Sequence, residues 1–193
     1  MGFPRATVSL PGWVEELLSD PGREYPTEED RMRLVIELSR SNVDHGTGGP
    51  FGAGIFDPST NRLVAPGVNL VATANLSAAH AKMVAIMIHS RSSGTSTWAV
   101  RASCVRAGRQ HGTVSDGLRR DSVVRRPASR MRRAEEDARG IGFDEGTKVS
   151  DWVAAQEQRG ISVARDVCRD EAAAVLRYYV ESGGITYNAR QGA

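Results

Sequence analysis

The spacing of apolar residues predicts helices in the first part of the chain. Between residues 28 and 43, apolar side chains recur every three or four positions, which is the pattern of an amphipathic helix. Thr27 precedes this stretch and Asp30 stands three positions later, so we expect the pair to cap the helix. A short helical turn is predicted over Trp13–Leu18, and the Pro-Gly pair that follows should end it.

A β-hairpin and another helix are predicted next. Phe51–Phe56 and Leu63–Val71 are apolar runs, and the Asp-Pro-Ser-Thr-Asn sequence between them is typical of a turn. Ala78–His89 is apolar at most of its positions, so we expect a helix that is largely buried. The hairpin and this helix should therefore share one core.

The last part of the chain predicts two more helices and a strand. The helices are expected over Asp151–Arg159 and Asp170–Ser182, the second ended by a Gly-Gly pair. Between them, Ile161–Ala164 is predicted to be a short strand. Helices and strands thus alternate along the chain, which indicates an α/β fold with a mixed sheet in a single domain of residues 1–193.

Positive charge is concentrated in residues 91–133. The whole chain has a formal net charge of +2, a balance that favours neither a nucleic acid nor a membrane surface as partner. Residues 91–133, however, contain 11 Arg and only two acidic residues, Asp116 and Asp121, which gives this segment a charge of +9. Because it has no periodic apolar face, we expect the segment to be poorly ordered on its own.

The cysteine content and the N-terminal sequence predict a cytoplasmic protein. Cys104 and Cys168 form no C-x-x-C pair, so a disulfide framework is not expected and a reducing compartment fits. The first residues lack the features of a signal sequence, and no apolar run has the length of a membrane span. We therefore expect no membrane partner.

Five short motifs occur in an order that resembles the cytidine deaminase-like superfamily. They are Gly48–Ala53, Asn69–Val71, Ser77–Ala81, Gly142–Gly146 and Ile185–Asn188. The last two resemble the branch of the bacterial guanine and nucleoside deaminases, and the resemblance covers about residues 29–90 and 134–189. It implies a three-layer αβα sandwich, a homodimer, and a parent reaction in which guanine or a related nucleoside is hydrolytically deaminated.

The resemblance also implies a zinc site, from which this chain departs. In zinc deaminases a His and two Cys hold the metal, and a Glu two residues after the His transfers protons. His80 matches the metal-binding His, but Lys82 occupies the position of the Glu, and the P-C-x-x-C sequence is absent. An ammonium group has no lone pair with which to act as a base, and one imidazole does not hold zinc competitively. We therefore expect weak zinc binding and no deaminase activity.

Three further residues are implied to contact the nucleobase or nucleoside substrate. They are Asn69, which should hydrogen-bond the base, Phe51, and Tyr187, which with Asn188 should line a neighbouring or domain-swapped active site. For two of the candidate residues a structural interpretation stays open. His80 is then an ordinary buried histidine without a metal, and Tyr187 is then part of a packed C-terminal tail.

The genetic code provides an interpretation of residues 91–133 as a frameshifted segment. Reading back one permitted codon for each residue of Trp98–Val114 and dropping the first base allows a sequence that ends in Ala-Cys-Glu-Leu-Val-Ala-Ser-Thr-Glu-Pro. This sequence resembles the strand that leads into the zinc motif, and the shifted reading onward to Arg133 resembles the ligand helix and the next strand. In that frame Gly117 and Leu118 cannot encode the second Cys. A frameshift would disrupt the central strand–helix–strand unit of the fold.

Two other interpretations of residues 91–133 are an Arg- and Ser-rich surface insertion and an RNA-binding arm. Trp98 is the single aromatic residue of the segment, and there is no Gly-Arg repeat, which argues against nucleic-acid binding. The sequence therefore predicts a degenerate zinc-dependent nucleobase or nucleoside deaminase. The alternative is a non-catalytic binding protein with an Arg-rich insertion that contacts nucleic acid.

Overall fold

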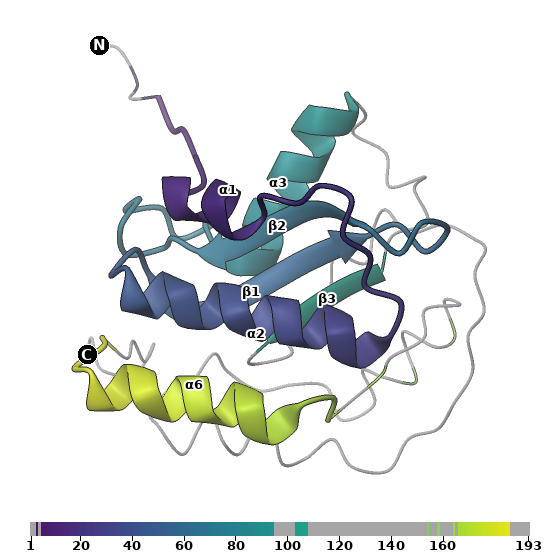
Figure 1. The fold of residues 1–193 in the computed structure, drawn as a ribbon. Coiled ribbons are helices and arrows are strands. Elements are labelled where there is room, and N and C mark those ends of the chain that lie inside the picture. Colours follow the sequence, from purple (N-terminus) through teal and green to yellow (C-terminus); the bar gives the residue numbers. More distant parts are fainter. Residues whose placement is uncertain are drawn as a thin grey trace.

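The computed structural model describes residues 5–94 and 166–185, with Phe3, Ala154, Gln158, Ala164 and the backbone of residues 103–107. Its helices and strands, shown in Figure 1, are α1 (Gly12–Leu17), α2 (Glu28–Asp44), β1 (Gly49–Phe56), β2 (Leu63–Asn69), α3 (Ala81–Ser93), β3 (Ser103–Ala107) and α6 (Arg169–Glu181). The predicted helix Asp151–Arg159 and strand Ile161–Ala164 lie outside the described residues, apart from the single positions given above.

Helix α2 begins where its capping sequence predicts. The Thr27 hydroxyl accepts a hydrogen bond from the Asp30 backbone N–H at 3.0 Å, and the Asp30 carboxylate accepts one from the Thr27 N–H at 3.2 Å. This reciprocal arrangement satisfies two N–H groups that a helix terminus otherwise leaves without an internal partner. The buried face of α2 includes Leu34, Val35 and Leu38, as its apolar spacing indicates.

The predicted hairpin is present, and β1 is the central strand of the sheet. The order of the three described strands is β2-β1-β3, and both pairings are antiparallel. Within residues 91–133, which we expected to lack a strand–helix–strand unit, Ser103–Ala107 is a strand whose backbone pairs with Gly52–Phe56, and the rest of that segment beyond residue 94 lies outside the described residues. The free edge of β1 provides hydrogen-bonding groups that a short segment of weak strand propensity can satisfy.

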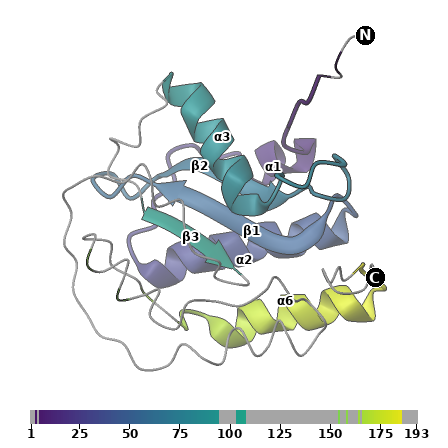
Figure 2. The same cartoon turned by 180° about the vertical axis from the view of Figure 1, so that it is seen from behind.

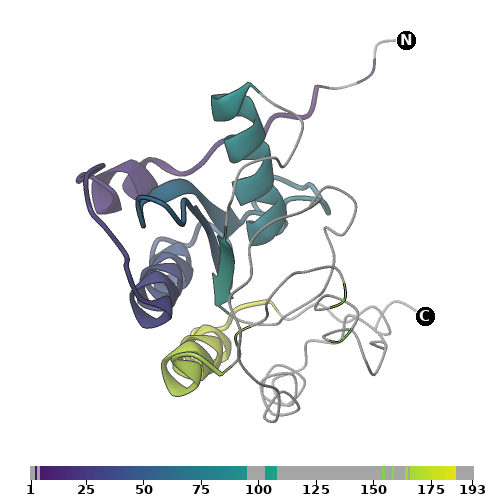
Figure 3. The same ribbon diagram turned by 90° about the vertical axis from the view of Figure 1, so that its right-hand side faces the viewer.

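Helices cover both faces of this sheet, which confirms the predicted three-layer sandwich. A Cβ atom on Gly52 would meet the carbonyl oxygen of Val35 in α2, so this face of β1 packs against α2. Ala53 points to the other face, where its cross-strand partner Gly67 lies against Ala81 of α3. In Figure 3, α2 and α6 lie on one side of the sheet and α3 on the other.

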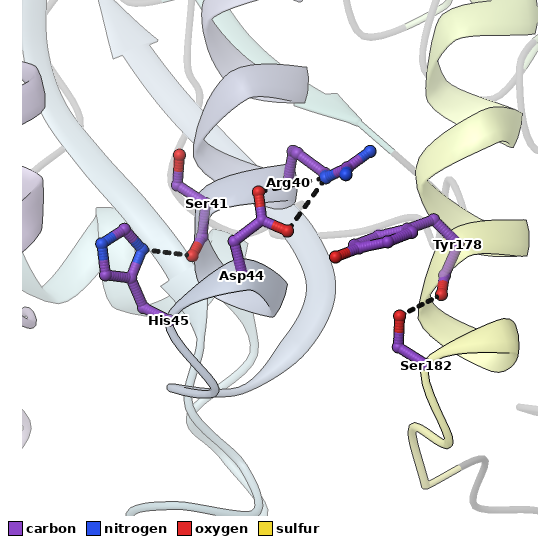
Figure 4. Close-up of polar contacts among 6 residues, drawn as sticks. All are labelled: Arg40, Ser41, Asp44, His45, Tyr178 and Ser182. Atoms are coloured by element: carbon purple, nitrogen blue, oxygen red, sulfur yellow. Dashed lines mark hydrogen bonds and ion pairs between the residues drawn. The ribbon is translucent and has the colours of Figure 1, made fainter.

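Helix α6 runs beside α2, as Figures 1 and 2 both show. The Arg40 guanidinium lies over the ring of Tyr178, 3.5 Å from its centroid, and its Nε donates to Asp44 at 3.0 Å (Figure 4). Below these exposed contacts, Val175 and Leu176 of α6 are buried in the core. The apolar contacts fix α6 on the α2 side of the sheet.

The ends of two elements differ from the predicted ends. Strand β2 stops at Asn69 rather than Val71, because the Val71 N–H bonds to the Asn69 side chain and leaves the ladder. Helix α3 starts at Ala81 rather than Ala78, because the carbonyl of Ala79 accepts from Leu70 and holds the preceding residues against β2. The helix is also less buried than predicted, since Met87 is 38% exposed. Within the described part of the chain, no helix is long and apolar enough to cross a membrane.

Candidate functional site at the end of β2

Asn69 is a buried amide at the point where β2 ends. The residue is 2% exposed, and its Oδ1 accepts a hydrogen bond from the Val71 N–H at 3.1 Å. Because a backbone N–H can only donate, this contact fixes which end of the amide faces Val71. Among the described residues, no acceptor contacts Nδ2. The Asn69 side chain is therefore held in one orientation, with its Nδ2 donor directed away from the Val71 N–H.

The loop after β2 returns the chain to the same place. Leu70 donates its N–H to the carbonyl of Ala79 at 2.9 Å, which sets the residues next to them, Asn69 and His80, at the same end of the sheet. His80 is half-buried and is the N-cap of α3, with an extended backbone (φ −66°, ψ 147°). Its carbonyl accepts from Val84 and so begins the helix.

Helix α3 begins in direct contact with β2. A Cβ atom on Gly67 would lie 2.1 Å from the Ala81 carbonyl oxygen and 2.6 Å from the Ala85 nitrogen, so only glycine permits this approach. Lys82, which is half-buried, stands in the first turn of the helix, where the partial positive charge of the backbone disfavours a cation. The arrangement thus brings Asn69, His80 and Lys82 to one end of the sheet.

The structure does not place the remaining predicted site residues, Phe51 and Tyr187, beside Asn69, His80 and Lys82. Phe51 is 2% exposed and packs in a core cluster with Ala53, Ile55 and Leu176. Its predicted contact with substrate stays a prediction. Tyr187, like Asn188 and Gly142–Gly146, lies outside the described residues.

The described residues alone do not fit a zinc ion. They contain no group of three or more His, Cys, Asp or Glu side chains placed to hold a metal. At His80 the donor set is one imidazole with an ammonium group two residues later, whereas zinc sites in enzymes use three protein ligands. The predicted role of His80 as a metal ligand stays a prediction.

Solved structures with this architecture are guanine deaminases. The protein NE0047, crystallised with 2,6-diaminopurine, is 28% identical to this chain, with a TM-score of 0.73, and the match covers 96% of this chain and 98% of NE0047. A structure of the guanine deaminase from Nitrosomonas europaea is 27% identical, with a TM-score of 0.70, over 92% of this chain and 98% of that protein. A variant of NE0047 in complex with 8-azaguanine is 29% identical, with a TM-score of 0.74, over 91% and 96% of the two chains.

The chain has the cytidine deaminase-like fold. The resemblance inferred from the sequence motifs is confirmed at the level of the fold. No family model matches the chain, and no curated protein matches it. The fold is therefore assigned from the architecture and from the sequence identities of 27–29% to these solved structures.

Sequence reasoning missed Asn42 and Thr47, which support Asn69 in this deaminase-like fold, and it gave Gly48 no role beyond its motif. Asn42 is fully buried, and its Nδ2 donates to the Asn69 carbonyl at 2.9 Å. Thr47 bonds to Asn42, and Gly48 approaches the Asn69 carbonyl so closely that a Cβ there would be 1.8 Å from the oxygen. A signal for Asn42 was present, because it stands four residues after Leu38 on the apolar face of α2.

Proposed function

We propose that this chain is a degenerate guanine deaminase domain that binds a purine base and does not deaminate it. The single observation that carries the proposal is Asn69, a buried amide whose oxygen is held by Val71 and whose nitrogen is available as a donor. The carbonyl and ring nitrogens of guanine are acceptors for such a donor. The relatives NE0047 and the Nitrosomonas enzyme support the ligand class, since NE0047 was crystallised with 2,6-diaminopurine and 8-azaguanine.

The proposed absence of catalysis rests on Lys82. In the parent reaction a carboxylate at this position would take a proton from the attacking water and pass it to the leaving amine. The Lys82 ammonium has no basic lone pair at neutral pH and would repel a metal dication near His80. The hydrolytic step is therefore left without a general base. This alone lowers the rate by about 10² to 10⁴, before any loss of metal is considered.

Asn69→Asp tests base binding most directly. An aspartate keeps an oxygen for the Val71 N–H but replaces the open donor by a second acceptor. We expect the wild-type chain to bind 8-azaguanine in isothermal titration calorimetry and the variant to bind it about 100-fold more weakly. Ser39→Ala is the matched control, since Ser39 is equally buried and its hydroxyl has no hydrogen-bond partner among the described residues. Equal affinity of wild type and Asn69→Asp would refute the assignment.

Metal content and ammonia release test the chemical part of the proposal. Purified protein should contain less than one zinc per chain and release no ammonia from guanine, guanosine or cytidine above background. The Lys82→Glu variant should also be inactive, because it restores a carboxylate but not the missing thiolates. One tightly held zinc per chain together with ammonia released from guanine by the wild-type chain would refute this part.

We further propose that the protein is cytoplasmic and forms homodimers. The reducing environment suggested by its two cysteines supports the first statement, and the resemblance to deaminases supports the second. Sedimentation velocity at micromolar concentration should give a mass of about twice the 20.8 kDa of one chain. A monomer at all concentrations would contradict the dimer.

A further inference from the structure

Asn42 joins the ends of two strands through one fully buried side chain. Its Nδ2 donates to the Gly49 carbonyl at 2.8 Å and to the Asn69 carbonyl at 2.9 Å. Its Oδ1 accepts from the Thr47 hydroxyl at 2.7 Å. The first residue of β1 and the last residue of β2 are therefore held by the same amide of α2.

The Asn42 side chain lies where the sheet itself is irregular. Gly49 pairs with Asn69 and Gly52 with Val68, so the register shifts between these two pairs. A regular ladder supplies hydrogen bonds at every second residue, and a shift of this kind interrupts them. Asn42 donates to both carbonyls at this end of the ladder, which makes it the polar link that determines where the Asn69 backbone lies.

The contacts continue from Asn42 to the N-terminal helix. The Thr47 hydroxyl oxygen accepts from the Trp13 Nε1–H at 3.1 Å. The Trp13 indole is stacked on His45, with 5.1 Å between ring centroids, and the His45 Nδ1–H donates to the Ser41 carbonyl (Figure 4). Helix α1 is thereby tied to the end of α2 and, through Thr47 and Asn42, to Asn69.

We propose that Asn42 is a positioning residue that sets the donor of Asn69 toward the bound base, and that Thr47 and Trp13 hold Asn42 in its orientation. This inference rests on the proposed function, in which Asn69 binds a purine. Asn42 itself is buried behind the strand ends, and it acts through the Asn69 backbone rather than on the ligand. Its loss would remove a donor from the buried Asn69 carbonyl and from the partly buried Gly49 carbonyl, and would allow Asn69 to shift.

The test combines hydrogen exchange with ligand affinity in Asn42→Ala, Thr47→Val and the control Ser39→Ala. The Val71 amide reports the Asn69 side chain directly, because it donates to Oδ1. The Leu176 amide, within α6 on a different element, reports general loosening of the core. In Asn42→Ala we expect Val71 to exchange at least tenfold faster relative to Leu176, and 8-azaguanine to bind about tenfold more weakly.

Thr47→Val keeps the shape of the side chain and the Asn42 amide while removing the hydroxyl. It should produce the same two effects at smaller size, and it should shift the Trp13 indole N–H resonance, which loses its acceptor. Ser39→Ala should leave all three readouts unchanged, since the hydroxyl that it removes is buried and has no hydrogen-bond partner among the described residues.

Each outcome separates the positioning role from a merely structural one. Parallel acceleration of Val71 and Leu176, or an unchanged Val71 with unchanged affinity, would overturn the proposal. If the wild-type chain binds no 8-azaguanine while Val71 is still loosened selectively, the purine-binding function fails and the control of Asn69 by Asn42 stands. The two hypotheses are therefore refuted by different results.

Discussion

Gly67→Ala is expected to displace the start of α3 and to destabilise the whole domain. The added methyl group would lie 2.1 Å from the Ala81 carbonyl oxygen, 2.6 Å from the Ala85 nitrogen and 2.9 Å from the Ala85 Cβ. Ordinary van der Waals contacts begin near 3.4 Å, so α3 must move away from β2 by more than 1 Å. Two of the three obstructing atoms belong to the backbone, and no side-chain rotation relieves the overlap.

The size of the effect follows from this geometry. Forcing an extra methyl group into a packed core costs about 1–3 kcal/mol, and contacts with backbone favour the upper end of that range. Replacing glycine with alanine also restricts the unfolded chain, which returns about 0.4–1 kcal/mol. We therefore expect the free energy of unfolding to fall by about 2 kcal/mol. Because Ala79 and His80 stand directly before α3, the same shift should weaken the hydrogen bond between Leu70 and Ala79.

Urea unfolding followed by tryptophan fluorescence measures this change. With a slope of about 1–3 kcal/mol per molar urea, a loss of 2 kcal/mol lowers the midpoint by roughly 1 M. Gly12→Ala in α1 is the control, since no atom lies within 4 Å of the Cβ that it would add. That variant should be more stable than wild type by up to about 1 kcal/mol. A Gly67→Ala midpoint at or above that of wild type would refute the close packing of α3 on β2.

Three further predictions concern the helices. Leu38→Ala should lower the free energy of unfolding by about 2–5 kcal/mol, because its side chain is fully buried, whereas Met87→Ala on the exposed side of α3 should cost less than the Leu38 variant in the same urea titration. Hydrogen bonds from Thr27 lower the pKa of Asp30 below its ordinary value of 3.8. The carboxylate therefore stabilises the fold fully above pH 3.8, and this stabilisation is lost as the pH falls through the lower pKa of the folded state. NMR titration should show the pKa of Asp30 rising toward 3.8 in Thr27→Ala. Lys82→Glu should change the free energy of unfolding by less than about 1 kcal/mol, since a carboxylate suits the first turn of a helix, and a larger loss would show that Lys82 is part of the packing.

The elements that the sequence predicted best are those with local determinants. Helix α2 follows from its apolar spacing and from the Thr27 cap, and both are properties of adjacent residues. The end of β2 was misplaced because the Val71 N–H bonds to the Asn69 side chain, and the start of α3 because Leu70 bonds to Ala79; apolar spacing contains no information about either contact. Ser103–Ala107 was missed for a similar reason, since its pairing depends on the free edge of β1 rather than on its own composition.

The candidate site shows the same division. The motif resemblance singled out Asn69 and His80 as candidates, because their residue types and spacing suit a known chemistry. Asn42 belongs to no such motif, and its importance arises only when two strand ends meet at its amide. Positioning residues of this kind become visible once the fold is known, because their partners are backbone atoms that every residue possesses.

Binding and chemistry depend on separable parts of this site. Asn69 is fixed by contacts of its backbone and its Oδ1, and these involve Asn42, Gly48 and Val71. The approach of α3 to the sheet is set by Gly67 against the backbone of Ala81 and by Ala85, so it does not require a particular side chain at position 82. Under the proposed function, a lysine at this position would remove the general base and leave the contacts that hold Asn69 in place. We therefore expect Lys82→Glu to leave the affinity for 8-azaguanine unchanged, whereas Asn42→Ala should weaken it, because the Asn42 amide contacts the backbone of Asn69.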